Sequence, residues 1–372
     1  MKILILGDIG ASESNLTEFC EANSKLFSNE IVNKCKSADI VLLNLEKPLS
    51  DVASPLGKCP PDYIAPTDSI NGILILRPTA VTLANNHILD QGEAGLDSTV
   101  ETLKKHNIQH VGTGKNIDEA KQPLIIERNG IKIGIYACCE KEFSFATENK
   151  PGANVFDPLN SIDDIASLKT RCDFLIVLFH GGMQDFPYPT PYQRKVCRKM
   201  CDKGADLIVC QHSHIIGCEE WWNNSCIVYG QGNFLLDEKN DPNWRSGLAI
   251  EVTMNLNGWE INYIPTLVEK HCVRINNNAD RIMSHFYERS EVIKNESTYK
   301  NLYVQMCRSK LPSYLIKMSG KRDLTHRIIR RLGLEKIYSK YLYDYIGLNR
   351  FLDYLYCDSH REAIERGLED YL

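Results

Sequence analysis

The sequence lacks any run of about 18 apolar residues, the length that a transmembrane helix requires, so we expect no membrane-spanning segment. Its opening apolar run, Met1–Leu6, is too short for a signal peptide and ends on Gly7-Asp8 instead of a small-residue cleavage site. We therefore expect this run to be the first core strand of a cytoplasmic protein.

The chain also lacks an excess of positive charge. Its 43 lysines and arginines are outnumbered by 48 acidic residues, and the net charge of -5 gives no reason to expect nucleic-acid binding. Its 14 cysteines are scattered over 372 residues without the spacing of a disulfide framework or a zinc knuckle. We expect them to be reduced, mostly buried thiols.

Short runs rich in Ile, Val and Leu, without polar alternation, predict strands that are buried on both faces. These runs are Lys2–Leu6, Asp39–Leu43, Ala80–Leu83, Phe174–Phe179 and Leu207–Cys210. Amphipathic spacing predicts helices over Gly92–His106 and Tyr192–Lys203. Asn129-Gly130 and Asn257-Gly258, each between apolar runs, predict two hairpins. The mixture indicates an α/β (α+β) fold in which helices cover mixed sheets.

The character of the sequence changes near residue 275. Asn276–Asn278 is a polar break, and the part after it is rich in Tyr, Arg, Lys and Leu with few strand signals. We predict a catalytic domain over residues 1–275 and a helical C-terminal region over residues 279–372.

Polar side chains that can bind metals follow each of the five predicted strands. In order along the chain they are Asp8, then Asn44 and Glu46, then Asn85, Asn86 and His87, then His180, and finally His212 and His214. Ligands of α/β sheets bind outside the carboxyl ends of the strands, so these groups are expected to converge on one site. Taken singly, most of them are better explained as turn, cap or hydrogen-bonded structural residues.

The types of ligand indicate two metal ions. Carboxylates, an amide oxygen and imidazoles form a mixed oxygen and nitrogen set, which suits Mn, Fe or Zn better than Ca or Mg. About six ligands are too many for one catalytic ion with open positions, but they suffice for two ions about 3.5–4 Å apart. Such a pair activates a shared water, and an imidazole can then serve as general acid for the leaving group.

Several motifs resemble the CapA family, named for poly-γ-glutamate capsule biosynthesis, over roughly residues 1–270. They are Leu6-Gly7-Asp8, Asn44-Leu45-Glu46, the run from Leu83 to Gly92, His180-Gly181-Gly182 with Pro189 and Gln193, Gly204-Ala205-Asp206 before His212-Ser213-His214, and the run from Tyr229 to Phe234. That family is similar to calcineurin-like metallophosphoesterases. The resemblance implies a four-layer αββα sandwich, followed here by the helical C-terminal region.

The resemblance also implies roles. Asp8 and His214 would hold one metal, and Asn86, His180 and His212 the other. Glu46 would bridge them, with Asn44 as substitute or neighbour, and His87 would be the catalytic general acid. Substrate or supporting residues would be Asn44, Asn85, Asp90, Gln184 and Asn233. Three departures concern the pocket more than the metals: Asp8 starts no Asp-x-His motif, Gln184 replaces an acidic residue, and Gly217 replaces a glutamine.

Residues 317–356 combine a basic stretch with closely spaced aromatics. From Lys317 to Lys340 the eight lysines and arginines outnumber the two acidic residues, Asp323 and Glu335. The apolar residues Leu324, Ile328, Ile329 and Leu332 are expected along one helical face. Such a segment suits peripheral contact with an anionic membrane, at the inner face if the protein is cytoplasmic. The favoured explanation is nevertheless a helical lid or dimer face that packs on the catalytic domain and has a solvated basic side, and nucleic-acid binding is a weaker third alternative.

The leading functional hypothesis is a two-metal hydrolase of a phosphoester or related anionic group, small or polymeric, in capsule or surface-polymer biosynthesis. A hydroxide held between the metals would attack, and His87 would assist the leaving group. One alternative is a metal-dependent component for amide-bond formation or transfer that works with other polymer-synthesis proteins. Because the sequence has no Gly-x-x-x-x-Gly-Lys-Ser/Thr loop, any nucleotide would then require a partner. The other alternative is a non-catalytic assembly scaffold.

Overall fold

The computed structural model describes residues 1–57, 61–237, 239–255, 258–319 and 323–371. The chain forms two compact units, Met1–Glu296 and Ser297–Leu372. Helix α8 (Ala279–Lys294) belongs to the first unit. The functional boundary proposed near residue 275 stays a prediction.

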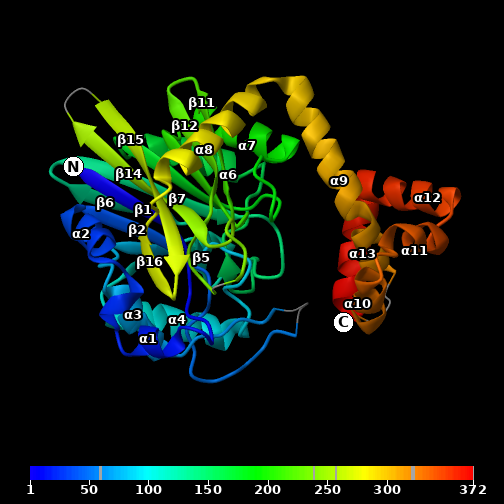
Figure 1. Cartoon of the computed structure of the whole chain (residues 1–372), viewed down its shortest axis with the longest axis horizontal. Coiled ribbons are helices and arrows are strands. Elements are labelled where there is room, and N and C mark those ends of the chain that lie inside the picture. The colour runs from blue at the N-terminus through cyan, green and yellow to red at the C-terminus, as the bar shows by residue number, and fades with distance from the viewer. Residues whose placement is uncertain (58–60, 238, 256–257, 320–322, 372) are drawn as a thin grey trace. The chain divides into compact units, whose positions relative to one another are not determined.

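The first sheet of the larger unit has eight strands within the described residues (Figure 1). Its parallel part is made of β1 (Lys2–Ile9), β2 (Ile40–Leu45), β3 (Ala80–Thr82) and β4 (Gln109–Val111), with the short β13 (Asn233–Leu235) also parallel to β1. Its antiparallel part is made of β14 (Ser246–Asn255), β15 (Gly258–Glu269) and β16 (Cys272–Ile275).

The second sheet of the same unit has the strand order β11-β12-β10-β9-β7-β6. Its strands are β6 (Leu124–Arg128), β7 (Ile131–Cys139), β9 (Phe174–His180), β10 (Leu207–Gln211), β11 (Ile216–Trp222) and β12 (Ser225–Gln231). The four central strands are parallel, and the two edge strands are antiparallel to their neighbours. A small separate pair consists of β5 (Thr113–Gly114) and β8 (Gly152–Ala153).

The five strands predicted from apolar runs are therefore confirmed as β1, β2, β3, β9 and β10. The hairpin β6–β7 is also confirmed: Asn129 and Gly130 have φ angles of 54° and 76°, which a two-residue turn of this type requires. Strands β14 and β15 form the second antiparallel pair, and their predicted turn residue Asn257 lies outside the described residues.

Two apolar layers hold the larger unit together. Ile3 and Ile5 of β1 point into the space between the two sheets, where they join a buried cluster with Ile135 of β7. Leu4 and Leu6 point the other way, into a second cluster beneath the helices. Alternate residues of β1 thus serve both clusters, which explains why its sequence shows no polar alternation.

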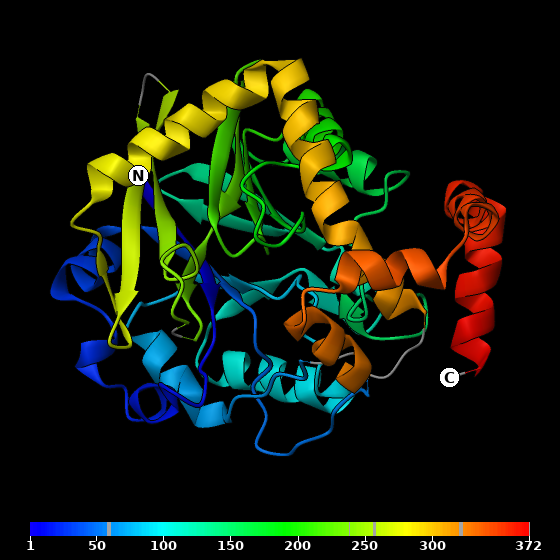
Figure 2. The same ribbon diagram turned by 45° about the vertical axis from the view of Figure 1, so that its right-hand side comes forward.

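Helices cover the outer face of each sheet (Figures 1 and 2). Those beside the first sheet are α1 (Leu16–Cys20), α2 (Asn29–Ser37), α3 (Ile70–Leu74) and α4 (Gly92–Lys105), with the short 3-10 turns η1 (Ser24–Leu26) and η2 (Thr67–Ser69). Those on the second are α6 (Ser161–Lys169) and α7 (Pro191–Asp202), while α5 (Ile117–Ala120) packs on β5. The arrangement is the expected four-layer αββα sandwich.

The two helices predicted from amphipathic spacing are confirmed as α4 and α7. Helix α7 begins at Pro191, and its cap Thr190 accepts a hydrogen bond from the Gln193 backbone N–H at 3.1 Å. The thirteen cysteines that the structure describes are all free thiols, as expected, and most are buried.

The C-terminal part of the chain is helical, as its composition predicted. After α8, whose Phe286 reaches the core between the sheets, come α9 (Glu296–Met318), α10 (Asp323–Arg331), α11 (Glu335–Leu342), α12 (Tyr345–Tyr356) and α13 (Asp358–Tyr371). Among the described residues, none of the helices combines the length and the apolar character needed to cross a membrane.

Candidate metal centre

The strand ends bring the predicted ligands to one edge of the sandwich. Asp8, near the end of β1, lies in register with Asn44 of β2 on one side and Asn233 of β13 on the other. His180 is the last residue of β9, opposite Gln211 of β10. The carboxyl ends of the parallel strands in both sheets therefore face the same site.

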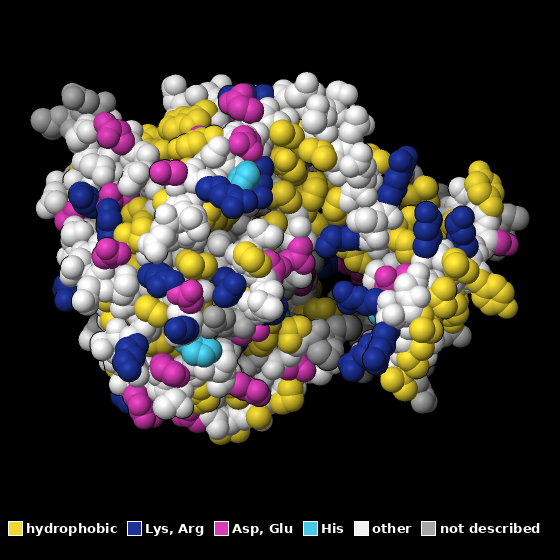
Figure 3. Space-filling view, viewed as in Figure 1, with side chains coloured by type: hydrophobic (Ala, Val, Ile, Leu, Met, Phe, Trp, Pro, Cys, Tyr) yellow, Lys and Arg dark blue, Asp and Glu magenta, His cyan; other side chains and the backbone are white. Residues whose placement is uncertain are grey.

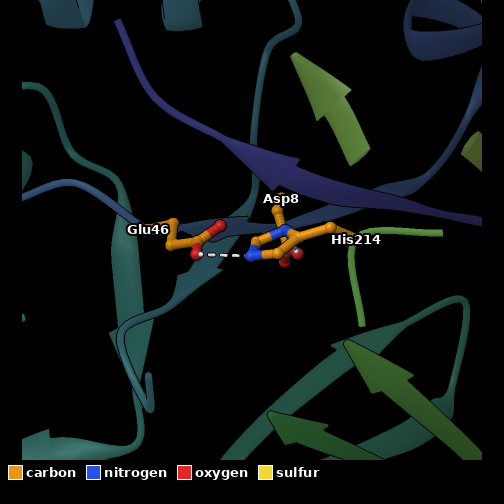
Figure 4. A group of neighbouring side chains, drawn as sticks. All are labelled: Asp8, Glu46 and His214. Carbon is orange, nitrogen blue, oxygen red and sulfur yellow. Dashed lines mark ion pairs between the residues drawn. The ribbon is translucent and has the colours of Figure 1, made fainter. Parts of the chain in front are cut away.

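A first group of ligands consists of Asp8, Glu46 and His214, shown in Figure 4. Their ligand atoms all lie within 4.8 Å of one another, and all three residues are buried. His214 Nε2 lies 3.7 Å from Glu46 Oε1, and His214 Nδ1 lies 3.6 Å from Asp8 Oδ2. Two carboxylates and one imidazole around one point make a set that can hold a divalent cation.

A second group consists of Asn86, His180 and His212. His180 Nε2 lies 3.0 Å from Asn86 Oδ1 and 3.2 Å from His212 Nδ1. An amide oxygen and two imidazole nitrogens again converge on a small volume, and these three residues are also buried. The resemblance implied the same partners for Asp8 and for His180, with Glu46 as a bridge between the two metals, and this ligand assignment stays a prediction.

Asp8 of the first group reaches the second group, since its Oδ1 lies 4.0 Å from His180 Nδ1, and the side chain of Asn44 contacts both groups. Its Nδ2 donates to Asp8 Oδ1 at 2.8 Å and lies 3.3 Å from His180 Nδ1. The described contacts of Glu46 with the imidazoles reach only the first group, through His214. Of the two residues expected at the bridging position, Asn44 therefore lies between the groups, whereas Glu46 lies within one of them.

The backbone is strained where it carries the His-x-His motif. His212 and His214 have φ angles of 85° and 58°, in the left-handed region that residues other than glycine seldom adopt. Each such residue costs about 1–3 kcal/mol, and strain of this kind concentrates at functional sites. Here it turns both imidazoles, two positions apart, toward the same cluster.

Asn85 and Asn233 support the ligands from behind. Asn85 Nδ2 donates to Asn44 Oδ1 at 3.1 Å and to the Leu45 carbonyl at 2.9 Å, and Asn85 Oδ1 accepts from the His87 backbone N–H at 3.0 Å. Asn233 Oδ1 lies 2.8 Å from His214 Nδ1, which orients that ring.

His87 lies at the mouth of the site rather than among the ligands. Its Nδ1 lies 2.7 Å from Asp90 Oδ2, and its ring centroid is 4.5 Å from that of Tyr63. A cavity of about 590 Å³ opens there, and its walls include Asn86, His87, His214, Gln184, Tyr63, Glu142, Lys239 and Trp244. Gln184 lies in the wall of this cavity, and its role toward a substrate stays a prediction.

Burial strongly disfavours charge in this cluster. It raises the pKa of Asp8 to about 7, with the Glu46 carboxylate as the next cause, and raises the pKa of Glu46 to about 7. Burial also lowers the pKa of His212 to about 3 and that of His180 well below its ordinary value. Two carboxylates and neutral imidazoles without enough positive charge form a set that divalent cations would complete.

A buried oxygen atom of Glu46 supports the same conclusion. Among the described residues, Glu46 Oε2 has no hydrogen-bond partner, although buried carboxylate oxygens are normally paired. A metal ion would provide the missing partner. The donor types, the burial and this oxygen together fit a divalent metal centre.

Glu142 is a charged residue of the site that the sequence analysis did not single out. Its Oε2 accepts from Asn86 Nδ2 at 3.1 Å, and its Oε1 lies 3.7 Å from His212 Nε2. It follows β7, which pairs in parallel with β9, so its position at the same sheet edge was available from the hairpin prediction. Glu142 adds a carboxylate to the second group, which otherwise has none.

Two aromatic side chains of the cavity wall were also not anticipated. The Trp244 ring centroid lies 4.6 Å from that of His214, and the Lys239 ammonium lies over the Trp244 ring at 3.1 Å from its centroid. On the other side, the Lys47 ammonium lies over the Tyr63 ring at 4.7 Å. Both cations contact aromatic faces next to a site that is otherwise rich in carboxylates.

Residues 2–238 match the model of a family described as "Bacterial capsule synthesis protein PGA_cap". The chain is 33% identical over 175 residues to the PGA biosynthesis protein CapA of Bacillus subtilis, covering 46% of each chain. It is 29% identical over 215 residues to a probable polyglutamine synthesis accessory protein of Mycobacterium tuberculosis, covering 54% of this chain and 56% of that one. The chain thus spans about half the length of the curated relatives it matches.

Two solved structures are among those similar to this chain. A structure described as a novel phosphatase from Mycoplasma pneumoniae has a TM-score of 0.47 at 16% identity, covering 72% of this chain and 93% of that one. A putative 5'-nucleotidase from Staphylococcus aureus has a TM-score of 0.46 at 11% identity, and the match covers 77% of this chain and 58% of that one.

Proposed function

Because the chain belongs to the bacterial capsule synthesis protein family, we propose that it is a two-metal hydrolase of a phosphoester or related anionic group in capsule or surface-polymer biosynthesis. The observation that carries this proposal is the pair of buried ligand groups at one sheet edge, one around Asp8 and one around His180. Together the two groups offer about six donor residues, more than one catalytic ion with open positions can use, which favours two ions over one.

The ligand assignment follows these groups. Asp8, Glu46 and His214 would hold one ion, and Asn86, His180 and His212 the other, with Asn44 between them. When bound, the two ions would supply Lewis acidity toward a phosphoryl oxygen and would lower the pKa of a coordinated water. Mn, Fe and Zn suit this mixed set of oxygen and nitrogen donors.

His87 is proposed as the general acid. Asp90 holds His87 Nδ1 at 2.7 Å, which fixes the tautomer and leaves Nε2 as the atom that exchanges a proton with the leaving oxygen. Tyr63 packs against the ring and limits its rotation. Lys239, in the wall of the same cavity, would attract an anionic substrate.

The proposed function is tested by measuring the metal content of the protein together with its hydrolysis of phosphate esters. The protein would be stripped with chelator, reloaded with Mn²⁺, Fe²⁺ or Zn²⁺, and assayed with p-nitrophenyl phosphate and its bis ester. We expect about two bound ions and hydrolysis of at least one ester. His87→Ala should keep the ions and lose about 10²–10⁴ in kcat. His285→Ala, on the exposed face of α8, should behave as the wild type.

A second candidate is supported by the names of the relatives, which refer to the synthesis of polymers. In it the same metals would orient a carboxylate or acyl phosphate for amide-bond formation or transfer. Activity that appears only with a partner synthase and ATP would favour this candidate. A scaffold without catalysis would instead tolerate His87→Ala in every functional assay. Two bound ions without turnover of any ester or amide would contradict hydrolysis.

A further inference from the structure

Helices α10 and α11 of the C-terminal unit expose apolar side chains in stripes. Leu324 and Ile328 of α10 are 68% and 52% exposed, and Leu332, which directly follows the helix, is 62% exposed. The Leu332 backbone N–H donates to the Ile328 carbonyl at 3.0 Å, so the spacing of four residues keeps these side chains on one face. In α11, Ile337 and Tyr341 are 68% and 86% exposed with the same spacing. Apolar side chains so arranged and so exposed normally mark an interaction surface.

A cation directly precedes four of these five apolar residues. Arg327, Arg331, Lys336 and Lys340 stand immediately before Ile328, Leu332, Ile337 and Tyr341, and all four are exposed. A step of one residue turns the helix by about 100°, so the cations flank one side of each apolar stripe. Figure 3 shows apolar and basic side chains next to one another on the visible face of this unit.

The charge of this face is strongly positive. Between Leu324 and Leu342 the only acidic residue is Glu335, and its carboxylate already faces His326 Nε2 at 3.1 Å. The opposite face of α10 is buried within the unit through His326 and Ile329. Helix α10 therefore packs within the unit through one face and exposes its apolar stripe on another.

We propose that this basic–apolar face of α10 and α11 docks on an anionic lipid surface. A cationic helix lying in the membrane interface buries its apolar side chains and places Lys and Arg among anionic headgroups. A second copy of the same face would bring like charges together, and a nucleic acid would leave the apolar stripes exposed. The proposal concerns where the protein works and does not depend on the proposed hydrolysis.

The experiment is co-sedimentation of the full chain with vesicles. Phosphatidylcholine vesicles with and without 30% phosphatidylglycerol would be compared at low and high salt. We expect binding to the anionic vesicles only, and weaker binding as salt rises. Each neutralised cation should weaken binding about fivefold, so Arg327→Gln combined with Lys340→Gln should weaken it about 25-fold. Lys104→Gln with Lys105→Gln, at the exposed end of α4, is the matched control and should bind as the wild type.

A second measurement keeps the proposal falsifiable if the variant folds poorly. Hydrogen exchange of the wild type with vesicles should show new protection within residues 324–342. Equal binding to neutral vesicles, no binding, or protection confined to other segments would overturn the proposal. So would a stable dimer that Arg327→Gln with Lys340→Gln dissociates, or binding of RNA that competes with vesicles.

Discussion

Asp90 Oδ2 lies 2.7 Å from His87 Nδ1, and the same oxygen accepts a hydrogen bond from the Tyr63 backbone N–H at 2.7 Å. Asp90 is buried, so its carboxylate can hold the imidazole without competition from water. Two donors on one oxygen fix both the ring of His87 and the segment that packs against it. In the proposed mechanism Asp90 would therefore act on the reaction through His87.

Asp90→Asn should lower kcat by about 10–100-fold while the metal content stays unchanged, because supporting partners of site residues typically matter to this degree. KM should change little, because Asp90 contacts His87 and is not among the side chains described as lining the cavity. The readouts are metal analysis and separate values of kcat and KM. An altered metal content, or an unchanged kcat, would contradict this positioning role.

The strands and the polar residues at their ends could be predicted from the sequence, because strands buried on both faces appear as short runs of Ile, Val and Leu without polar alternation. Asp8, His180 and His212 were found in this way. How the two sheets face each other could not be predicted, because periodicity says nothing about packing between sheets. For this reason the split into two ligand groups came from the resemblance, and the position of Asn44 between them came from the structure.

Glu142 illustrates the limit most clearly. Its strand was predicted, but its carboxylate lies three residues past Cys139, the last residue of β7, where loop geometry decides which way a side chain points. Likewise, the helical character of residues 279–372 was predicted from composition. The bounds of α9 were not, since this helix contains Pro312 in its interior.

The two ligand groups should lose metal separately. His214→Ala removes an imidazole from the Asp8 group, and His180→Ala removes one from the Asn86 group. Each variant should bind about one ion where the wild type binds about two. The measurement is metal content by mass spectrometry after reloading with Mn²⁺. His110→Ala, at the edge strand β4, serves as the control, and loss of both ions in either variant would indicate one coupled site.

The stability of the metal-free protein should depend on Glu46 in a pH-dependent way. Burial raises the pKa of Glu46 from 4.5 to about 7, so the folded state holds a proton that the unfolded state has lost between these values. The stability that the protonated Glu46 side chain gives to the folded state is fully present below pH 4.5 and is lost as pH rises through about 7. Removing the carboxyl group therefore helps the folded state only at the higher pH.

Glu46→Gln should accordingly raise the Tm of chelator-treated protein at pH 8 and leave it nearly unchanged at pH 4. The measurement is thermal unfolding with a dye at both pH values. Glu127→Gln, on the exposed part of β6, should change neither Tm. An equal effect of Glu46→Gln at both pH values would mean that packing, not charge burial, governs this position.

Glu142→Gln should weaken metal binding at the Asn86 group. The substitution keeps the size of the side chain and its contact with Asn86, but it removes the negative charge 3.7 Å from His212 Nε2. Since the second group has no other carboxylate among its proposed ligands, we expect a loss of about 10–100-fold in affinity for one ion, with the other ion retained. Titration calorimetry with Mn²⁺ measures both events, and Glu148→Gln in the exposed part of the same loop is the control. Unchanged affinity for both ions would show that Glu142 only lines the cavity.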